Sequence, residues 1–146
     1  MSKAQAGWMW AGLGVAAAYL GWTNRRLLTV SDVTSGESAA YPTLRSRVYY
    51  AEVADTMTAG ELSLSRLPGW KLLSRDAEND ILEATMSSGL LTDDVTVYFF
   101  SLGHGQTRVT IRSRSRAGIG DFGRNTAHVR QLQQAMDDRL NTGSAF

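Results

Sequence analysis

The pattern of apolar and polar positions divides the chain into an uncharged start and a longer part with regular periodicity. Positions 4–24 form a run of 21 residues without a charged side chain. As a helix, this run is about 31 Å long at ~1.5 Å per residue, which matches the hydrocarbon thickness of a bilayer. We therefore predict a hydrophobic anchor helix in 1–28, transmembrane or membrane-associated.

Small residues recur along this anchor at spacings of three and four. They are Gly7, Ala11, Gly14, Ala18 and Gly21. On a helix this spacing forms one stripe, and small residues let two helices pack closely in lipid. Trp8 and Trp10 at one end and Trp22 at the other suit the two membrane interfaces. We expect the stripe to pack against a partner subunit; a cleaved secretory signal and an amphipathic or core helix are the alternatives.

The segment 29–44 is rich in Ser, Thr and Gly and shows no periodicity. These features predict an extended linker that lies on a partner or on its own domain. The remaining residues, 45–146, form the predicted domain, which is long enough to bury a core without metals or disulfides. The chain has no cysteine, so disulfides are excluded.

Periodicity within this domain predicts five strands and two helices. The strands are expected at 45–51, 70–75, 81–87, 94–101 and 107–116. One helix is expected at 53–67, ended by Pro68 and Gly69, and another from Asp121, a good N-cap, to about 140. The predicted fold class is α+β: a two-layer sandwich of an antiparallel sheet with both helices on one face.

The clearest alternation runs through 94–101 and 107–116. If Leu102 pairs with Gln106 across the turn, Phe100 lies opposite Arg108. The odd positions then face the core: Val95, Val97, Phe99, Val109 and Ile111. The even positions form a candidate docking face: Tyr98, Phe100, Arg108, Arg112, Arg114 and Arg116.

Three interpretations of this even face remain open. The first interpretation is a solvated surface with cross-strand ion pairs such as Asp94 with Arg114, each of which contributes about 0–1 kcal/mol to stability. Alternatively it docks a protein, because arginine and aromatic residues are enriched at interface hot spots. The third interpretation is a surface for anionic lipid or nucleic acid.

Charge argues against nucleic acid as a partner. The net charge is only +1, and 13 of the 15 basic residues are arginine, which reduces the weight of any single arginine as a signal. Residues 51–104 sum to −6 and residues 105–146 to +4. These two parts are expected to pair within the fold.

The stretch VTIRSRSRAGIGDFGRNTAHVRQL at 109–132 resembles the motif of the DUF1499 family, proteins with a domain of unknown function. Shorter matches at 41–42, 69–70, 83–85 and 93–95 extend the resemblance over about 41–140. It implies no established activity or cofactor. The recurrent polar residues of the family map to Asp93, Asp94, Arg112, Ser113, Ser115, Arg116, Asp121, Asn125 and Arg130.

A role in stabilising the fold is the simplest explanation of these motif residues. Ser113 and Ser115 are expected on the inward face of their strand. Asn125 is expected to be buried and to tie the last helix to the loop 117–120, which Arg116 and Asp121 would clamp. The alternative is a ligand pocket built from Asp93, Arg112, Arg116 and Asn125.

Catalytic chemistry has little support in the sequence. His104 is expected to be exposed at a hairpin tip, and His128 to lie away from the apolar stripe of the last helix. No metal-ligand spacing, nucleophile elbow or phosphate-binding loop accompanies them. We expect no enzyme activity, no metal and no cofactor.

These patterns together favour a non-catalytic accessory or structural subunit of a membrane-protein complex, such as a photosynthetic or respiratory assembly. Its expected partners are other subunits and the lipid bilayer. Arg25 and Arg26 directly follow the anchor and place the domain on the cytoplasmic side. The alternative is a membrane-tethered module that binds a small lipophilic or anionic ligand in a cavity between sheet and helix, near Arg112 and Arg116.

Overall fold

The structure, a computed structural model, describes residues 31–116 and 123–141. Its strands are β1 Asp32–Thr34, β2 Arg47–Tyr49, β3 Trp70–Asp76, β4 Ile81–Ser88, β5 Leu91–Gly103 and β6 Gln106–Ser115. Its helices are α3 Val53–Leu64 and α4 Arg124–Asn141. The predicted anchor stripe and its tryptophans lie outside the described residues, as does Asp121. Within the described part, no helix has the length and apolar character needed to span a membrane.

The strands form one antiparallel sheet in the order β1-β6-β5-β4-β3, and β2 also pairs with β6. The sheet has six strands, one more than predicted. The additional strand, β1, comes from the segment expected to be an extended linker. Its central residue, Val33, is fully buried opposite Ser113. The described part of this segment therefore lies on the domain and contributes to its sheet.

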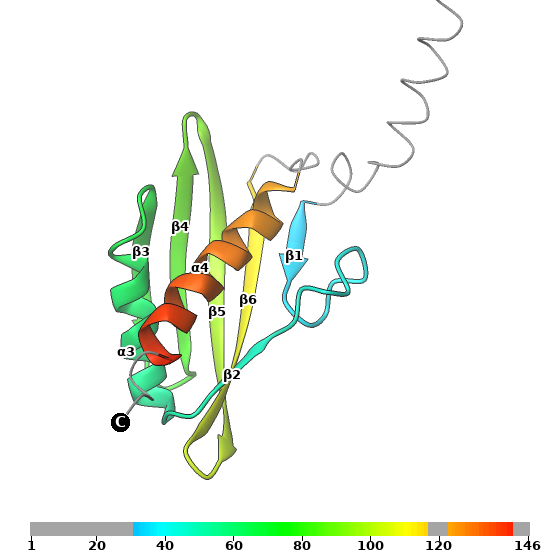
Figure 1. Cartoon of the computed structure of the whole chain (residues 1–146). Coiled ribbons are helices and arrows are strands. Elements are labelled where there is room, and N and C mark those ends of the chain that lie inside the picture. The colour runs from blue at the N-terminus through cyan, green and yellow to red at the C-terminus, as the bar shows by residue number, and fades with distance from the viewer. Residues whose placement is uncertain (1–30, 117–122, 142–146) are drawn as a thin grey trace, which may run out of the picture.

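Both helices lie on one face of the sheet, which confirms the predicted α+β class (Figure 1). Helix α3 packs on β3 to β6, and α4 packs on β1, β2, β6 and α3. Each helix buries an apolar stripe: Met57 and Leu64 of α3, and Val129, Leu132 and Met136 of α4. Their side chains fill the space over the sheet, so that a Cβ added to Gly60 would lie only 3.1 Å from Leu82 Cδ1.

The hairpin of β5 and β6 has the predicted register. Phe100 lies opposite Arg108, and all five residues expected in the core are at most 3 % exposed. The turn differs from the prediction, because Gly103 pairs with Gln106 after a shift in register. His104 and Gly105 between them both have positive φ, which leaves a tight two-residue turn.

The bounds of the helices differ slightly from the prediction. Helix α3 ends at Leu64, three residues early, and α4 begins at Arg124. Gly69, which follows α3, has a φ of +83°, and this left-handed conformation explains why a glycine stands there.

Candidate functional site

Two groups of polar residues stand out, one on each face of the sheet. We call the face opposite α3 and α4 the outer face, and the group beneath the start of α4 the inner cluster. The outer face includes the six residues predicted for docking: Tyr98, Phe100, Arg108, Arg112, Arg114 and Arg116. The inner cluster consists of Asp93, Ser113, Ser115, Arg124, Asn125 and His128.

An aromatic pair forms the apolar centre of the outer face. The rings of Tyr98 and Phe100 stack with centroids 6.4 Å apart. The guanidinium carbon of Arg108 lies 4.9 Å from the centroid of the Phe100 ring, a cation–π contact. Phe100 nevertheless remains 43 % exposed, and Val48 of β2, which lies opposite Arg108, is 49 % exposed. The outer face therefore leaves apolar area in contact with solvent.

Two of the four outer-face arginines form ion pairs, but not the pair expected. Asp94 lies opposite Arg114, yet its carboxylate pairs with Arg116 at 2.7 Å. Arg112 pairs with Asp32 of β1 through both Nε and Nη2. This hydrogen bonding holds the pKa of the Asp32 carboxyl below its usual range and raises the pKa of Arg112.

The other two arginines have no carboxylate partner in the described part of the chain. The Arg108 guanidinium lies over the Phe100 ring, and Arg114 forms no hydrogen bond or close ion pair with a described side chain. Both side chains are exposed. The charge of Arg108 is therefore available to an acidic group from outside the molecule, whereas the charge of Arg114 also acts on the nearby Asp32 carboxyl and helps to lower its pKa.

A groove of about 530 Å³ borders the aromatic pair. It lies between the outer face and the turn after β1, and its lining is Asp32, Thr34, Glu37, Ser38, Tyr98, Phe100, Thr110 and Arg112. The groove carries two carboxylates and a single guanidinium that is already paired. This charge balance disfavours an anionic ligand.

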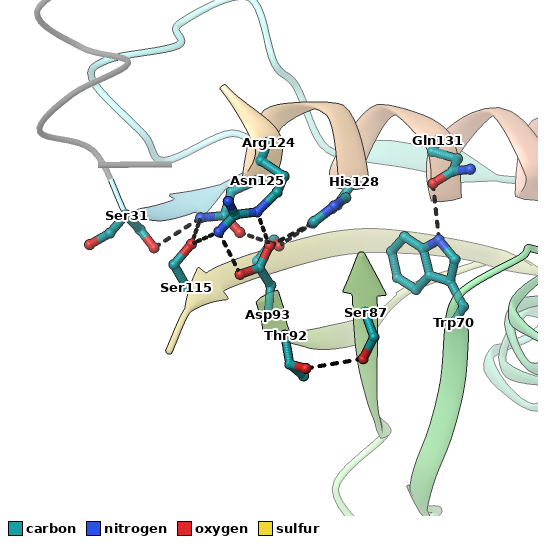
Figure 2. Close-up of polar contacts among 11 residues, drawn as sticks. Ser31, Trp70, Ser87, Thr92, Asp93, Ser115, Arg124, Asn125, His128 and Gln131 are labelled. Carbon is teal, nitrogen blue, oxygen red and sulfur yellow. Dashed lines mark hydrogen bonds and ion pairs between the residues drawn. The ribbon is translucent and has the colours of Figure 1, made fainter. Parts of the chain in front are cut away.

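The inner cluster lies where α4 crosses the ends of β5 and β6 (Figure 2). Asp93 is 1 % exposed, and both of its carboxylate oxygens accept hydrogen bonds from Arg124, at 2.7 and 3.0 Å. Such a fork-to-fork pair is the strong form of this interaction. It offsets the cost of burying the Asp93 charge, which would otherwise be several kcal/mol.

Asn125 completes the hydrogen bonding beneath the helix. It is fully buried, accepts a bond from Ser113 Oγ at 2.7 Å, and donates to Ser115 Oγ and to the carbonyl oxygen of Ser31. The predictions that Asn125 is buried and that both serines face inward are confirmed. Arg116 binds Asp94 on the outer face, and the loop 117–120 that it was expected to clamp lies outside the described residues.

The inner cluster contains a serine, a histidine and an aspartate, but not in a catalytic arrangement. Ser113 Oγ and Asp93 Oδ2 both approach the same ring nitrogen of His128, Nδ1, at 3.4 Å. In a catalytic triad the nucleophile and the orienting carboxylate contact opposite ring nitrogens of the histidine. His128 is also 4 % exposed and lies edge-on to Trp70, with ring centroids 5.8 Å apart. The cluster is therefore built to hold the fold together.

The structure separates the residues of the predicted ligand pocket. Asp93 and Asn125 lie in the inner cluster, whereas Arg112 and Arg116 lie on the outer face. Neighbouring residues of a strand point to opposite faces, and Asp93 faces inward while Arg112 and Arg116 face outward. The prediction of one pocket lined by all four is wrong.

Two residues of the inner cluster were missed by the sequence analysis. His128 was expected away from the core but is buried against Trp70. Arg124 was not singled out, although it neutralises Asp93. Helix α4 buries a wide face that includes Thr126 and Gln133, and a broader helical stripe would have included His128. Among the described residues, no three acidic or histidine side chains gather as a metal site requires.

Comparisons with known proteins support the family and the fold. A family described as "Protein of unknown function (DUF1499)" matches residues 27–136. No curated protein matches the chain in sequence.

Two solved structures have a similar fold. One is a START superfamily protein from Mycobacterium smegmatis, with 8 % identity and a TM-score of 0.52, covering 79 % of this chain and 100 % of that one. The other is norcoclaurine synthase from Thalictrum flavum in complex with dopamine and hydroxybenzaldehyde, with 10 % identity and a TM-score of 0.51, covering 85 % and 94 %.

Proposed function

The chain belongs to the DUF1499 family, and we propose that it is a non-catalytic accessory subunit of a membrane-protein complex. Its N-terminal segment tethers it to the bilayer, and the outer face of its sheet docks onto a neighbouring subunit. The candidate hosts are energy-converting assemblies, photosynthetic or respiratory. The uncharged run at 4–24 supports the tether, because its length and composition suit a bilayer.

One observation carries the docking role. The outer face exposes the ring of Phe100 beside Arg108, whose guanidinium pairs with no described carboxylate, and it carries a second exposed arginine, Arg114, farther along β6. A surface of this kind fits a partner that presents an apolar patch bordered by carboxylates, since burying the ring and pairing the arginines both favour association.

The alternative role, binding a small lipophilic or anionic ligand, has weaker support. It expects a cavity between sheet and helix, where the described side chains are closely packed around Gly60. The groove on the outer face is one other candidate, but Asp32 and Glu37 in its lining disfavour an anion. A second hollow of about 450 Å³ is lined by Arg114 and Arg116, and Asp94 already pairs with Arg116 there. The likeness to ligand-bound norcoclaurine synthase shows a shared fold and carries no evidence for a shared ligand.

A site-specific photo-crosslinker tests the proposal in native membranes. The full chain carries p-benzoylphenylalanine at position 100 or, as a control, at position 90, whose side chain is fully exposed in the β4–β5 turn. We expect a discrete crosslinked product with one membrane protein from position 100 and none from position 90.

Charge reversal then tests the chemistry of the partner. Arg108→Glu with Arg114→Glu should abolish the crosslink, whereas Arg66→Glu with Lys71→Glu, an equal change of charge elsewhere on the surface, should leave it intact. The proposal fails if position 100 gives no product, if both double variants behave alike, or if the chain extracted in mild detergent is monodisperse and alone.

A further inference from the structure

Three arginines line a small pocket that the proposed function does not use. It lies between the segment that leads into β2 and the middle of α4, and its volume is about 240 Å³. Its lining is Thr43, Leu44, Arg45, Arg47, Arg130, Gln133 and Gln134, without a carboxylate. We propose that this basic pocket binds a phosphate group, supplied either by an anionic lipid head group or by a small soluble phosphate compound.

The spacing of three residues along α4 determines the helical side of the basic pocket. Arg130, Gln133 and Gln134 stand three and four residues apart on α4, so their side chains lie on neighbouring positions of one helix face. Gln133 Nε2 donates a hydrogen bond of 2.8 Å to the carbonyl oxygen of Arg45. This bond fixes the strand-side wall to the helix, so the pocket is formed before any ligand arrives.

Arg47 is held in place from behind. Its Nε donates to Asp137 Oδ2 at 3.1 Å, and the Tyr49 hydroxyl donates to Oδ1 of the same carboxylate at 2.7 Å. Burial and this carboxylate raise the pKa of Tyr49, so the hydroxyl stays a neutral donor. Because the described contacts of Arg47 use Nε alone, its two terminal nitrogens remain for a ligand.

The other two guanidinium groups, those of Arg45 and Arg130, form no stabilising polar contact with the described residues. Arg45 and Arg130 are exposed, and neither forms an ion pair or side-chain hydrogen bond with a described residue. Arg130 belongs to the motif at 109–132, in which Arg112, Ser113 and Asn125 make internal bonds. Its position is explained by a ligand rather than by the fold.

Phosphate suits this pocket better than a carboxylate does. A guanidinium offers two parallel N–H donors that match a pair of phosphate oxygens. Three such groups can share the oxygens of one phosphate and balance a charge near −2, while the hydroxyl of Thr43 and the side-chain amide of Gln134 add further hydrogen-bonding groups at the rim. Because Asp137 already pairs with Arg47, two guanidinium charges need compensation, and a single carboxylate would leave one of them unbalanced.

Calorimetric titration of the full chain in a nonionic detergent tests the proposal. The probes are inorganic phosphate and dihexanoyl phosphatidic acid, with dihexanoyl phosphatidylcholine as the zwitterionic comparison. We expect one site per chain. Binding of phosphatidic acid alone assigns the ligand to lipid, binding of inorganic phosphate alone assigns it to a soluble compound, and mutual competition shows that both reach the same site.

Matched variants locate that site. Arg45→Gln with Arg130→Gln should weaken binding about tenfold or more, since both substitutions remove hydrogen bonds between charged groups. Arg66→Gln with Lys71→Gln removes the same charge elsewhere and should change the affinity less than about twofold. Thermal melts of both variants check that the fold is retained. The proposal is overturned if neither probe binds the unmodified chain, or if the two double variants bind alike.

Discussion

Asn125 donates a hydrogen bond from Nδ2 to the carbonyl oxygen of Ser31 at 3.0 Å, and the amide nitrogen of Ser115 donates to the same oxygen at 2.8 Å. The residue that precedes β1 is thereby joined to both the first turn of α4 and the end of β6. The inner cluster thus connects three parts of the chain that lie far apart in sequence. The stability of the fold should therefore depend strongly on each buried hydrogen-bonding residue of the inner cluster.

Replacing Asn125 by alanine should lower the free energy of unfolding by about 2–3 kcal/mol, because Ser113 and the Ser31 carbonyl each lose a buried partner. Urea denaturation measures this loss. Gln134→Ala, which removes an exposed amide bonded to Asp138, serves as the control and should stay within about 0.5 kcal/mol. Equal effects of the two substitutions would contradict a role for buried hydrogen bonds.

The Asp93–Arg124 pair should be strongly coupled. Asp93→Asn alone should cost about 3 kcal/mol, because the Arg124 guanidinium loses its buried counter-charge. Combining it with Arg124→Gln should cost clearly less than the two single changes together, with a coupling energy above about 1 kcal/mol. The same cycle on Asp94 and Arg116, which are 48 % and 54 % exposed, should give a much smaller coupling energy, because water screens an exposed pair. Similar coupling in both cycles would contradict this interpretation of the burial.

The Asp32–Arg112 pair predicts a dependence of stability on pH. The pKa of Asp32 is lower in the folded chain than its usual value, so the folded state binds fewer protons. This stabilisation is complete above the usual pKa of about 4 and disappears as the pH falls through the lowered value. Asp32→Asn should therefore cost up to about 1 kcal/mol at neutral pH. Below the lowered pKa the difference should vanish.

Thermal melts between neutral pH and strong acid measure this difference. Glu37→Gln removes a carboxylate that pairs with no described residue and should show no comparable change. A gap between Asp32→Asn and the unmodified chain that stays constant down to strong acid would exclude an ionic origin.

Alanine substitutions at two glycines distinguish the cost of backbone strain from the cost of steric overlap. Gly69 and Gly89 both have positive φ, but a Cβ at Gly69 would lie 2.7 Å from the Ser87 carbonyl oxygen, whereas a Cβ at Gly89 would meet nothing within 4 Å. Gly89→Ala should cost about 1 kcal/mol from strain alone. Gly69→Ala should cost about 1–3 kcal/mol more. Denaturation curves that place both variants at the same midpoint would contradict the close approach seen at Gly69.

The strict alternation of 94–101 and 107–116 was enough to predict the register of the main hairpin. Burial of Val97 and Ile111 excludes a slip by one residue, which would move every valine to solvent. The choice of ion pairs could not be predicted in the same way. Asp94 lies opposite Arg114 but pairs with Arg116, because a long arginine side chain reaches diagonal as well as direct neighbours.

Strand β1 was not predicted because three residues are too few to show a period. Its place in the sheet is decided by distant partners, the bond of Asp32 to Arg112 and the burial of Val33 against Ser113. His128 was misplaced for a related reason. Contacts with Trp70, Asp93 and Ser113 from other parts of the chain make its side of α4 an interior surface.

The two hydrogen bonds on the Ser31 carbonyl also have a mechanical consequence. If residues 1–30 are held by a membrane or a partner, any tension on the domain enters at Ser31 and is divided between β6 and α4. The short ladder of β1 on β6 then does not bear the load alone. The domain can resist being peeled open from its leading end, as a tethered protein must when its support moves.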